Sequence, residues 1–187
     1  MIPDADASAM QRLSGGDDLA LNEIMTRWQD KLTSFLWHMT HDHAATRDLV
    51  QESFVRLYMH RQRYRPHAPF SAYLFRIARN LLSNHIRWQS RHPAESLQTL
   101  SETGFDPSSE DPTPDQAMEE DETAREVRRA IASLPEDLRE ALVLFTYQGM
   151  TYRQMAEVFD CSEKAAETRL YRARQLLKEK LAPLVRE

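Results

Sequence analysis

The sequence predicts an all-α fold made of two small helical domains, and three observations carry that expectation. Apolar residues recur at helical spacing along most of the chain, whereas the strict alternation typical of a half-buried strand occurs nowhere. Hydrophobic residues make up 41% of the 187 residues, which is enough for a buried core. A stretch rich in Pro, Ser, Thr and acidic residues breaks the helical pattern at residues 92–116, which indicates a flexible acidic linker.

This division predicts an N-terminal tail at 1–16, a first helical domain at 17–91, the linker at 92–116 and a second helical domain at 117–187. No run of about 18 apolar residues could cross a membrane, and the acidic N-terminus does not resemble a signal peptide. The single cysteine, Cys161, excludes an internal disulfide framework. Together these features favour a cytoplasmic protein without membrane insertion.

The first domain is expected to hold three helices. The first has an apolar stripe formed by Leu19, Ile24, Trp28, Leu32, Phe35, Leu36 and Met39. The second covers about 44–60 and buries Val50, Ser53, Phe54 and Leu57, so the opposite face presents Asp48, Gln51, Glu52 and Val55. On residues alone, that opposite face is either a solvated surface or a binding surface.

The third helix, about 70–89, has two contrasting faces. Its buried face is expected to contain Leu74, Ile77, Ala78, Leu81, His85 and Trp88. Its other face presents Tyr73, Arg76, Asn80, Ser83, Asn84 and Arg87. This second face contains no acid, whereas a face that only serves solubility normally mixes both signs of charge.

The charge of the chain is strongly segregated, although the formal net charge is only −5. Residues 61–92 carry seven Arg and no acid, whereas residues 93–123 carry ten acids and no Lys or Arg. The loop before the third helix adds Arg61, Arg63, Tyr64 and Arg65. Guanidinium groups bind phosphates and aromatic rings stack on unpaired bases, so this segment favours single-stranded nucleic acid as a ligand.

The second domain is expected to start with a helix at about 117–133. Pro135 then opens another helix, whose inward side chains are Leu138, Ala141, Leu142 and Phe145, and Gly149 is expected to end it as a C-cap. Thr151 and Gln154 have the spacing of a capping box that begins the next helix.

A helix–turn–helix follows, with Asp160 in the turn and Ser162 as the N-cap of the last helix. The last helix buries Ala166, Leu170, Ala173 and Leu177. The second helix of such a pair enters the DNA major groove, which makes Lys164, Glu167, Thr168 and Tyr171 candidates for base contacts. The candidates for phosphate contacts are Arg172, Arg174 and Lys178.

Glu167 is unusual because a carboxylate repels phosphate. Within a groove it fits best as an acceptor for the cytosine N4 amino group. The alternative is a surface role, in which Glu167 pairs with Arg174 or with neighbours of Tyr171.

Four stretches in order carry a family resemblance: DLVQESFVRLY at 48–58, FSAYLFRIARNLLSNHIR at 70–87, LPEDLREALVLFTYQGMTYRQMAEVF at 134–159 and CSEKAAETRLYRARQLL at 161–177. Together they resemble an extracytoplasmic-function (ECF) sigma factor of bacterial RNA polymerase, of the sigma-70 family. Such factors keep only regions 2 and 4 of the larger family, joined by a linker. The resemblance implies a protein that binds core polymerase, directs it to promoters through −35 and −10 elements, and initiates transcription.

The resemblance also implies roles for the faces found above. The face with Asp48 and Glu52 is similar to the region 2 surface that docks on the coiled coil of the polymerase β′ subunit. The loop at 61–69 and the face through Asn80 and Asn84 are similar to the part that opens the −10 element and holds a flipped base. The last helix resembles the −35 reader, and the linker resembles a segment that enters the polymerase.

The implied partners are core polymerase through its β′ and β subunits, promoter DNA, and an anti-sigma factor that could hold the protein at the inner membrane. No cofactor, metal site or catalytic group is expected. This sequence departs from the family pattern at Arg47, Tyr73 and Glu167, and the last departure concerns the −35 sequence that is read.

Three other functions fit the sequence less well. A helix–turn–helix regulator acting without core polymerase would need a ligand or dimerisation domain, yet residues 17–91 instead carry a face suited to binding DNA. An enzyme would need a catalytic or metal-binding cluster, and His41 and His43 fit a surface or helix-cap role better. An anti-sigma or adaptor protein would lack the face expected to bind the −10 element.

Overall fold

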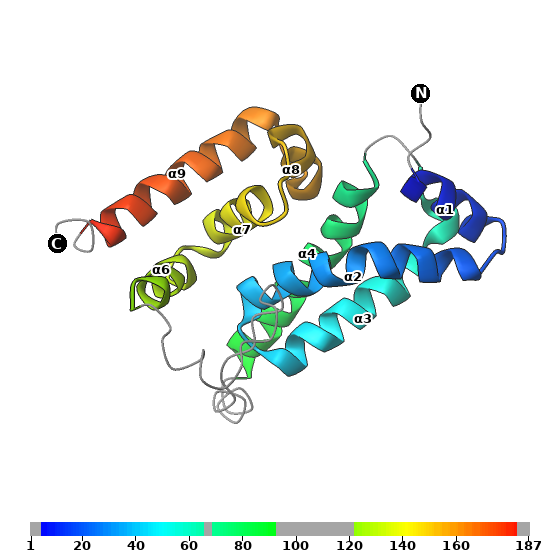
Figure 1. Ribbon diagram of the computed structural model, residues 1–187, viewed down its shortest axis with the longest axis horizontal. Coiled ribbons are helices and arrows are strands. Elements are labelled where there is room, and N and C mark those ends of the chain that lie inside the picture. The colour runs from blue at the N-terminus through cyan, green and yellow to red at the C-terminus, as the bar shows by residue number, and fades with distance from the viewer. Residues whose placement is uncertain (1–4, 66–68, 93–121, 183–187) are drawn as a thin grey trace.

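The computed structural model describes residues 5–65, 69–92 and 122–182, and every regular element in these ranges is helical, as predicted. The N-terminal half contains α1 (Ala5–Ser14), α2 (Leu19–Thr40), α3 (His43–Met59), the short 3₁₀ helix η1 (Arg61–Arg63) and α4 (Phe70–Arg91) (Figure 1). The C-terminal half contains α6 (Glu122–Ala132), α7 (Glu136–Thr146), α8 (Tyr152–Phe159) and α9 (Glu163–Leu181). The linker predicted at 92–116 lies, after its first residue, outside the described residues.

A tight turn folds α2 back against α3. His41 ends α2 in the left-handed conformation, with φ of 51°, and its backbone N–H donates to the Trp37 carbonyl. The Asp42 carboxylate then caps α3 by accepting a hydrogen bond from the Ala45 N–H at 3.0 Å. The cap and surface role expected for this His-Asp-His stretch is therefore confirmed.

Helix α4 packs on α2 through aromatic contacts and also lies against α3. Phe35 and Phe75 are fully buried and meet edge to face with ring centroids 5.4 Å apart, and Trp28 lies 6.2 Å from Phe75. The buried residues of α4 end at Leu82. Trp88, which the sequence analysis placed on the buried face, is instead 45% exposed because the last turns of α4 extend beyond the core.

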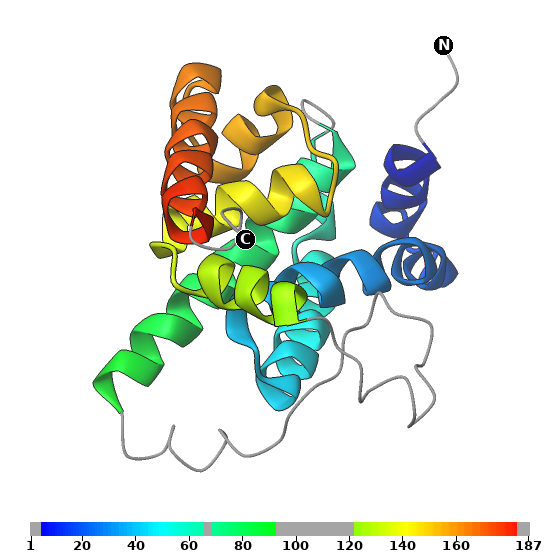
Figure 2. The ribbon, with the colours of Figure 1, turned by 60° about the vertical axis from the view of Figure 1, so that its left-hand side comes forward.

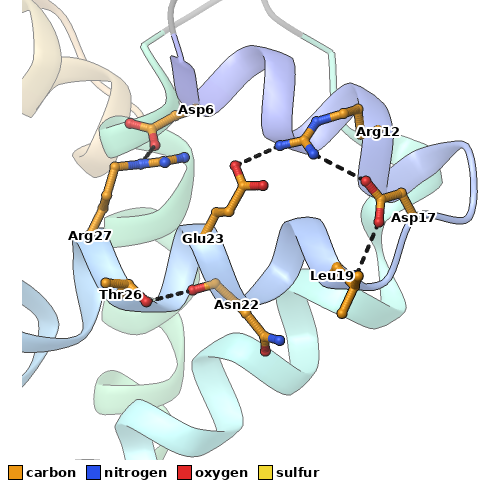
Figure 3. Close-up of polar contacts among 8 residues, drawn as sticks. All are labelled: Asp6, Arg12, Asp17, Leu19, Asn22, Glu23, Thr26 and Arg27. Atoms are coloured by element: carbon orange, nitrogen blue, oxygen red, sulfur yellow. Dashed lines mark hydrogen bonds and ion pairs between the residues drawn. The ribbon is translucent and has the colours of Figure 1, made fainter.

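The segment expected as an N-terminal tail differs most from the sequence analysis, because it forms helix α1. Its three fully buried residues, Ala9, Met10 and Leu13, join the core. The Arg12 guanidinium bridges the carboxylates of Asp17 and Glu23 at 3.1 and 2.6 Å, and Arg27 contacts Asp6 at 2.7 Å (Figure 3). A ten-residue helix with so few apolar residues lacks the long stripe that identified the other helices.

Helices α8 and α9 form the predicted helix–turn–helix. Both hydrogen bonds of the capping box between Thr151 and Gln154 are present, and the Ser162 hydroxyl accepts from the Ala165 N–H. Asp160 occupies the turn with φ of 53°. Gly149 also has a left-handed backbone but does not cap α7, which ends three residues earlier, at Thr146.

The two halves pack on each other, with α8 against α4 and α7 against α2 (Figure 2). The sequence analysis expected two domains joined by a linker and did not foresee this contact. Buried apolar residues of both halves belong to one continuous core, and the periodicity of a single helix does not reveal which helix packs against it.

Asp160 provides a test of the turn. Left-handed backbone costs an ordinary L-residue about 1–2 kcal/mol, and β-branched residues tolerate it least. We expect Asp160→Val to lower the free energy of unfolding by about 1–2 kcal/mol, while Asp160→Gly leaves it unchanged or raises it. Urea denaturation followed by circular dichroism measures both, and equal stability of the two variants would contradict the turn geometry.

Candidate polymerase and nucleic-acid interfaces

The face of α3 predicted for polymerase docking is assembled on the surface. Asp48 and Gln51 are exposed, and Val55 is 41% exposed although it is apolar and β-branched. Glu52 is partly buried and accepts from Arg56 Nε at 2.6 Å, one helical turn later. The four predicted residues therefore share one face that combines carboxylates with an apolar centre.

A groove beside this face extends it in a way the sequence analysis missed. The groove encloses about 590 Å³ between α2 and α3, and Gln51 and Val55 lie on its rim together with Arg47. Its apolar floor includes Leu21 and Met25 from α2 and Phe54 from α3. The contribution of α2 had no sequence signal, because Leu21 and Met25 lie beside the expected stripe rather than within it.

The polar face of α4 is exposed as predicted. Arg76, Asn80, Asn84 and Arg87 are all accessible and recur every three or four residues, so they follow one flank of the helix. Arg87 Nε donates to the Ser83 carbonyl at 3.1 Å, which holds its side chain along the helix. Among the described residues of α4 this flank presents amides and bases without an acid.

The loop that precedes α4 divides into anchored and exposed arginines. Arg61 Nη1 donates to the Tyr58 carbonyl at 2.8 Å, and its guanidinium lies 4.0 Å from the centre of the Tyr58 ring. The Ser14 hydroxyl of α1 also donates to the Arg61 carbonyl. Arg61 therefore fixes the backbone of η1. Arg63 and Arg65 are exposed, and Arg65 Nη1 also donates to the Gln62 and Tyr64 carbonyls, each at 3.1 Å.

Tyr64 does not lie where the sequence analysis placed it. Its side chain is only 9% exposed, and its ring packs 6.2 Å from Phe70 and 5.1 Å from Tyr73. A ring held inside the core is unable to stack on a base, so Tyr64 was wrongly included among the nucleic-acid contacts. Tyr73 is half-buried at the edge of the polar face, and burial raises the pKa of its hydroxyl, which keeps it a protonated donor at neutral pH.

The outer face of α9 gathers the residues predicted for the major groove. Lys164, Tyr171, Arg172 and Lys178 are exposed, and Tyr171 is 62% exposed. Glu167 pairs with Lys164 Nζ at 2.8 Å, a different partner from those considered in the sequence analysis. This hydrogen bond raises the pKa of Lys164, so its ammonium group stays charged at neutral pH.

Two further residues of this face are partly engaged inside the protein. The Thr168 hydroxyl donates to the Lys164 carbonyl at 2.7 Å, which restricts its availability for bases. The Arg174 guanidinium lies 4.8 Å from the centre of the Phe145 ring in α7, a cation–π distance, although Arg174 as a whole is exposed.

Comparisons with known proteins decide the family. The sigma-70 region 2 model matches residues 24–92, and the sigma-70 region 4 model matches residues 124–177. RNA polymerase sigma-H factor of Pseudomonas aeruginosa is 32% identical over 191 residues, covering 100% of this chain and 99% of that protein. The chain belongs to the ECF sigma factors of the sigma-70 family.

A further curated relative supports the same family, and two solved structures show the same fold. The ECF RNA polymerase sigma-E factor of Haemophilus influenzae is 31% identical, covering 96% of this chain and 97% of that protein. Among solved structures, CnrH in complex with the cytosolic domain of CnrY has a TM-score of 0.71 at 23% identity, covering 96% of this chain and 99% of that chain. RpoE of Bartonella quintana in complex with the anti-sigma factor NepR has a TM-score of 0.67 at 23% identity, covering 86% and 96%.

As a sigma factor, the protein binds core RNA polymerase and directs promoter-specific initiation of transcription. A regulator that acts without core polymerase is thereby excluded, since residues 24–92 belong to sigma-70 region 2. No helix among the described residues is long and apolar enough to cross a membrane. In the same residues, no group of three or more His, Cys, Asp or Glu side chains could hold a metal ion.

Proposed function

We propose that this sigma factor divides its task among three surfaces. The α3 face and the adjoining groove bind the coiled coil of the β′ subunit, the polar flank of α4 with Arg63 and Arg65 binds the opened −10 strand, and the outer face of α9 reads the −35 element. The observation that carries the proposal is the acid-free flank of α4, which lies on a different helix from the acidic docking face.

Chemistry supports the separation of the two surfaces. The α3 face has Asp48 and Glu52 around the apolar Val55, a combination that suits a basic protein partner and repels phosphate. The α4 flank offers amides that hydrogen-bond bases, together with arginines that bind phosphates. Tyr73, the half-buried aromatic at its edge, takes the stacking role that Tyr64 is unable to fill.

The domain boundaries follow from the same division. We propose region 2 at 17–91, a linker at 92–116 and region 4 at 117–187. The linker enters the polymerase, and the β subunit is a partner besides β′. Helix α1 is added to region 2 because it packs on α2. The protein acts in the cytoplasm, without enzymatic activity of its own. An anti-sigma partner, suggested by the complex of the Bartonella relative, would compete for these surfaces and could hold the protein at the inner membrane.

The docking face is tested by charge reversal. Like charges placed opposite each other across an interface cost several kcal/mol, so we expect Asp48→Arg with Glu52→Arg to weaken binding to core polymerase by more than about 100-fold. The matched control reverses Asp30 and Asp137, which are also exposed but lie outside this face. Co-purification and fluorescence anisotropy measure binding, and circular dichroism checks the fold. Equal binding by both double variants would remove the α3 face from the proposal.

The α4 flank is tested with Asn80→Ala. Loss of one base contact costs about 1–3 kcal/mol, so we expect promoter opening to fall by roughly 5- to 100-fold, with unchanged core binding. Asn22→Ala, an exposed asparagine on α2, is the matched control. Permanganate reactivity of unpaired thymines reports the opened strand. A bubble as large as that of the wild type would show that Asn80 has another role.

Glu167 is tested by a randomised −35 library. We expect Glu167→Ala to relax the base preference at one position, and Glu167→Arg to shift that position toward guanine, because arginine contacts guanine O6 and N7. Either change also releases Lys164 from its hydrogen bond. Glu179→Arg, further along α9 and exposed, controls for added positive charge. Identical preferences in the wild type and the Glu167 variants would make Glu167 a surface residue.

A further inference from the structure

The loop that follows α3 is attached at its first residue to helix α1. Ser14, the last residue of α1, donates its hydroxyl to the carbonyl of Arg61, the first residue of η1. The backbones of α1 and η1 also lie close together. Ser14 and Arg61 are 47 residues apart in the sequence, so this hydrogen bond fixes the start of the loop to a distant element.

Tyr58, in the last turn of α3, provides a second attachment. Arg61 Nη1 donates to the Tyr58 carbonyl at 2.8 Å, and the Arg61 guanidinium covers the Tyr58 ring at 4.0 Å from its centre. The Tyr58 hydroxyl donates to Asp18 Oδ1 at 3.1 Å. Asp18 directly precedes α2, so the ring that supports Arg61 is itself held by another helix.

Arg61 therefore has the contacts of an internal anchor. Its guanidinium is engaged by a carbonyl and an aromatic face, and its Nε atom is buried. A cation held in this way has little freedom to follow a phosphate. Arg63, two residues later, is exposed and is free of this arrangement.

Helix α1 is itself fixed firmly enough to act as a brace. Its three fully buried apolar side chains pack in the core with those of α2. The Arg12 guanidinium adds ion pairs to Asp17 and Glu23 (Figure 3). Exposed ion pairs contribute little to stability, so burial of the apolar side chains provides most of the attachment.

The other end of η1 is fixed by aromatic packing. Tyr64 is 9% exposed, and its ring lies against those of Phe70 and Tyr73. The loop is thus held on both sides of Arg63, at Arg61 and at Tyr64. Ordering a loop costs conformational entropy, and a loop already ordered in the folded protein avoids that cost when a ligand binds.

We propose that Ser14, Tyr58 and Arg61 are positioning residues for binding of the opened −10 strand. They hold η1 in one conformation, so that Arg63 and Arg65 meet the strand without further ordering of the loop. Helix α1 thereby takes part in −10 recognition without contacting DNA. The proposal rests on the assignment of this loop and α4 to the −10 element.

The anchor is tested with holoenzyme assembled from full-length protein and core polymerase. The ligand is a single-stranded oligonucleotide with the −10 sequence that the wild type selects, and fluorescence anisotropy measures its affinity. We expect Ser14→Ala to weaken binding by roughly 5- to 30-fold, the equivalent of ordering about one residue. Ser14→Thr keeps the hydroxyl and should restore binding. Ser8→Ala, the same change at an exposed position of α1, is the matched control and should have no effect.

Two outcomes of this measurement would overturn the anchor. One is wild-type affinity of the Ser14→Ala holoenzyme for the oligonucleotide. The other is a loss of core binding by Ser14→Ala that accounts for the whole effect, which a parallel measurement with core polymerase would reveal.

A double-mutant cycle separates positioning from a general effect on the fold. If Ser14 acts through the loop arginines, Ser14→Ala should change affinity by less than about twofold once Arg63 and Arg65 are both alanine. In an Arg87→Ala background, on the far part of α4, the full effect of Ser14→Ala should remain. An equal effect in both backgrounds would overturn positioning. Failure of the −10 assignment would appear differently, as wild-type affinity of the variant that lacks both loop arginines.

Tyr58 is tested with two substitutions at saturating core polymerase, because its side chain also lines the groove between α2 and α3. Tyr58→Phe keeps the ring beneath Arg61 and removes only the hydrogen bond to Asp18. Tyr58→Leu removes the ring as well. We expect the leucine variant to bind the oligonucleotide as weakly as Ser14→Ala and the phenylalanine variant to lie between it and the wild type. Wild-type affinity of Tyr58→Leu would remove Tyr58 from the positioning residues.

Discussion

The packing of α4 is the constraint on which the rest of the structure depends. One side of this helix is buried against α2 and α3, where Phe75 meets Phe35. Because that side is committed to the core, the periodicity of the helix fixes the direction of every other side chain. Arg79 is directed toward the C-terminal half, and Asn80 and Asn84 are directed to solvent. A single amphipathic helix thereby serves the core, the contact between halves and the proposed nucleic-acid surface.

Segregation of charge between neighbouring helices explains how an acidic protein can bind DNA. The carboxylates of Asp48 and Glu52 lie on α3, whereas α4 and the loop before it carry arginines without acids. Screening limits the reach of exposed charges to about 10 Å at ordinary ionic strength. Each face therefore acts on its partner through its local charge, and the net charge of the whole chain has little influence on either contact.

Much of the fold was predictable from residue types because the signals are local. The capping box at Thr151 and the turn at Asp160 depend on backbone geometry over a few residues, and both were recognised. Helix α1 was missed because ten residues with a short apolar stripe do not stand out from a tail. Whether Trp88 is buried depends on where the neighbouring helices end, and the sequence of α4 alone does not contain that information.

The candidate sites were predictable only in part, for the same reason. Helical spacing was enough to place Asn80, Asn84 and the outer residues of α9 on accessible faces, since only the period of one helix matters. Tyr64 was misplaced because loop residues follow tertiary contacts, here the rings of Phe70 and Tyr73. Two features join residues that are distant in sequence, so no local sequence pattern predicts them. They are the groove formed with α2 and the ion pair between Arg79 and Glu140.

Specific initiation by purified components tests the central claim most directly. The protein is mixed with core RNA polymerase and a library of double-stranded templates randomised at both promoter elements. Each template carries a downstream barcode that identifies its promoter, and the barcodes of the run-off transcripts are sequenced. The account predicts transcripts that depend on the protein and that come from templates with selected bases at both the −10 and the −35 element, as required when α4 and α9 each read one element. Transcripts that show selection at a single element, or none that depend on the protein, would contradict it.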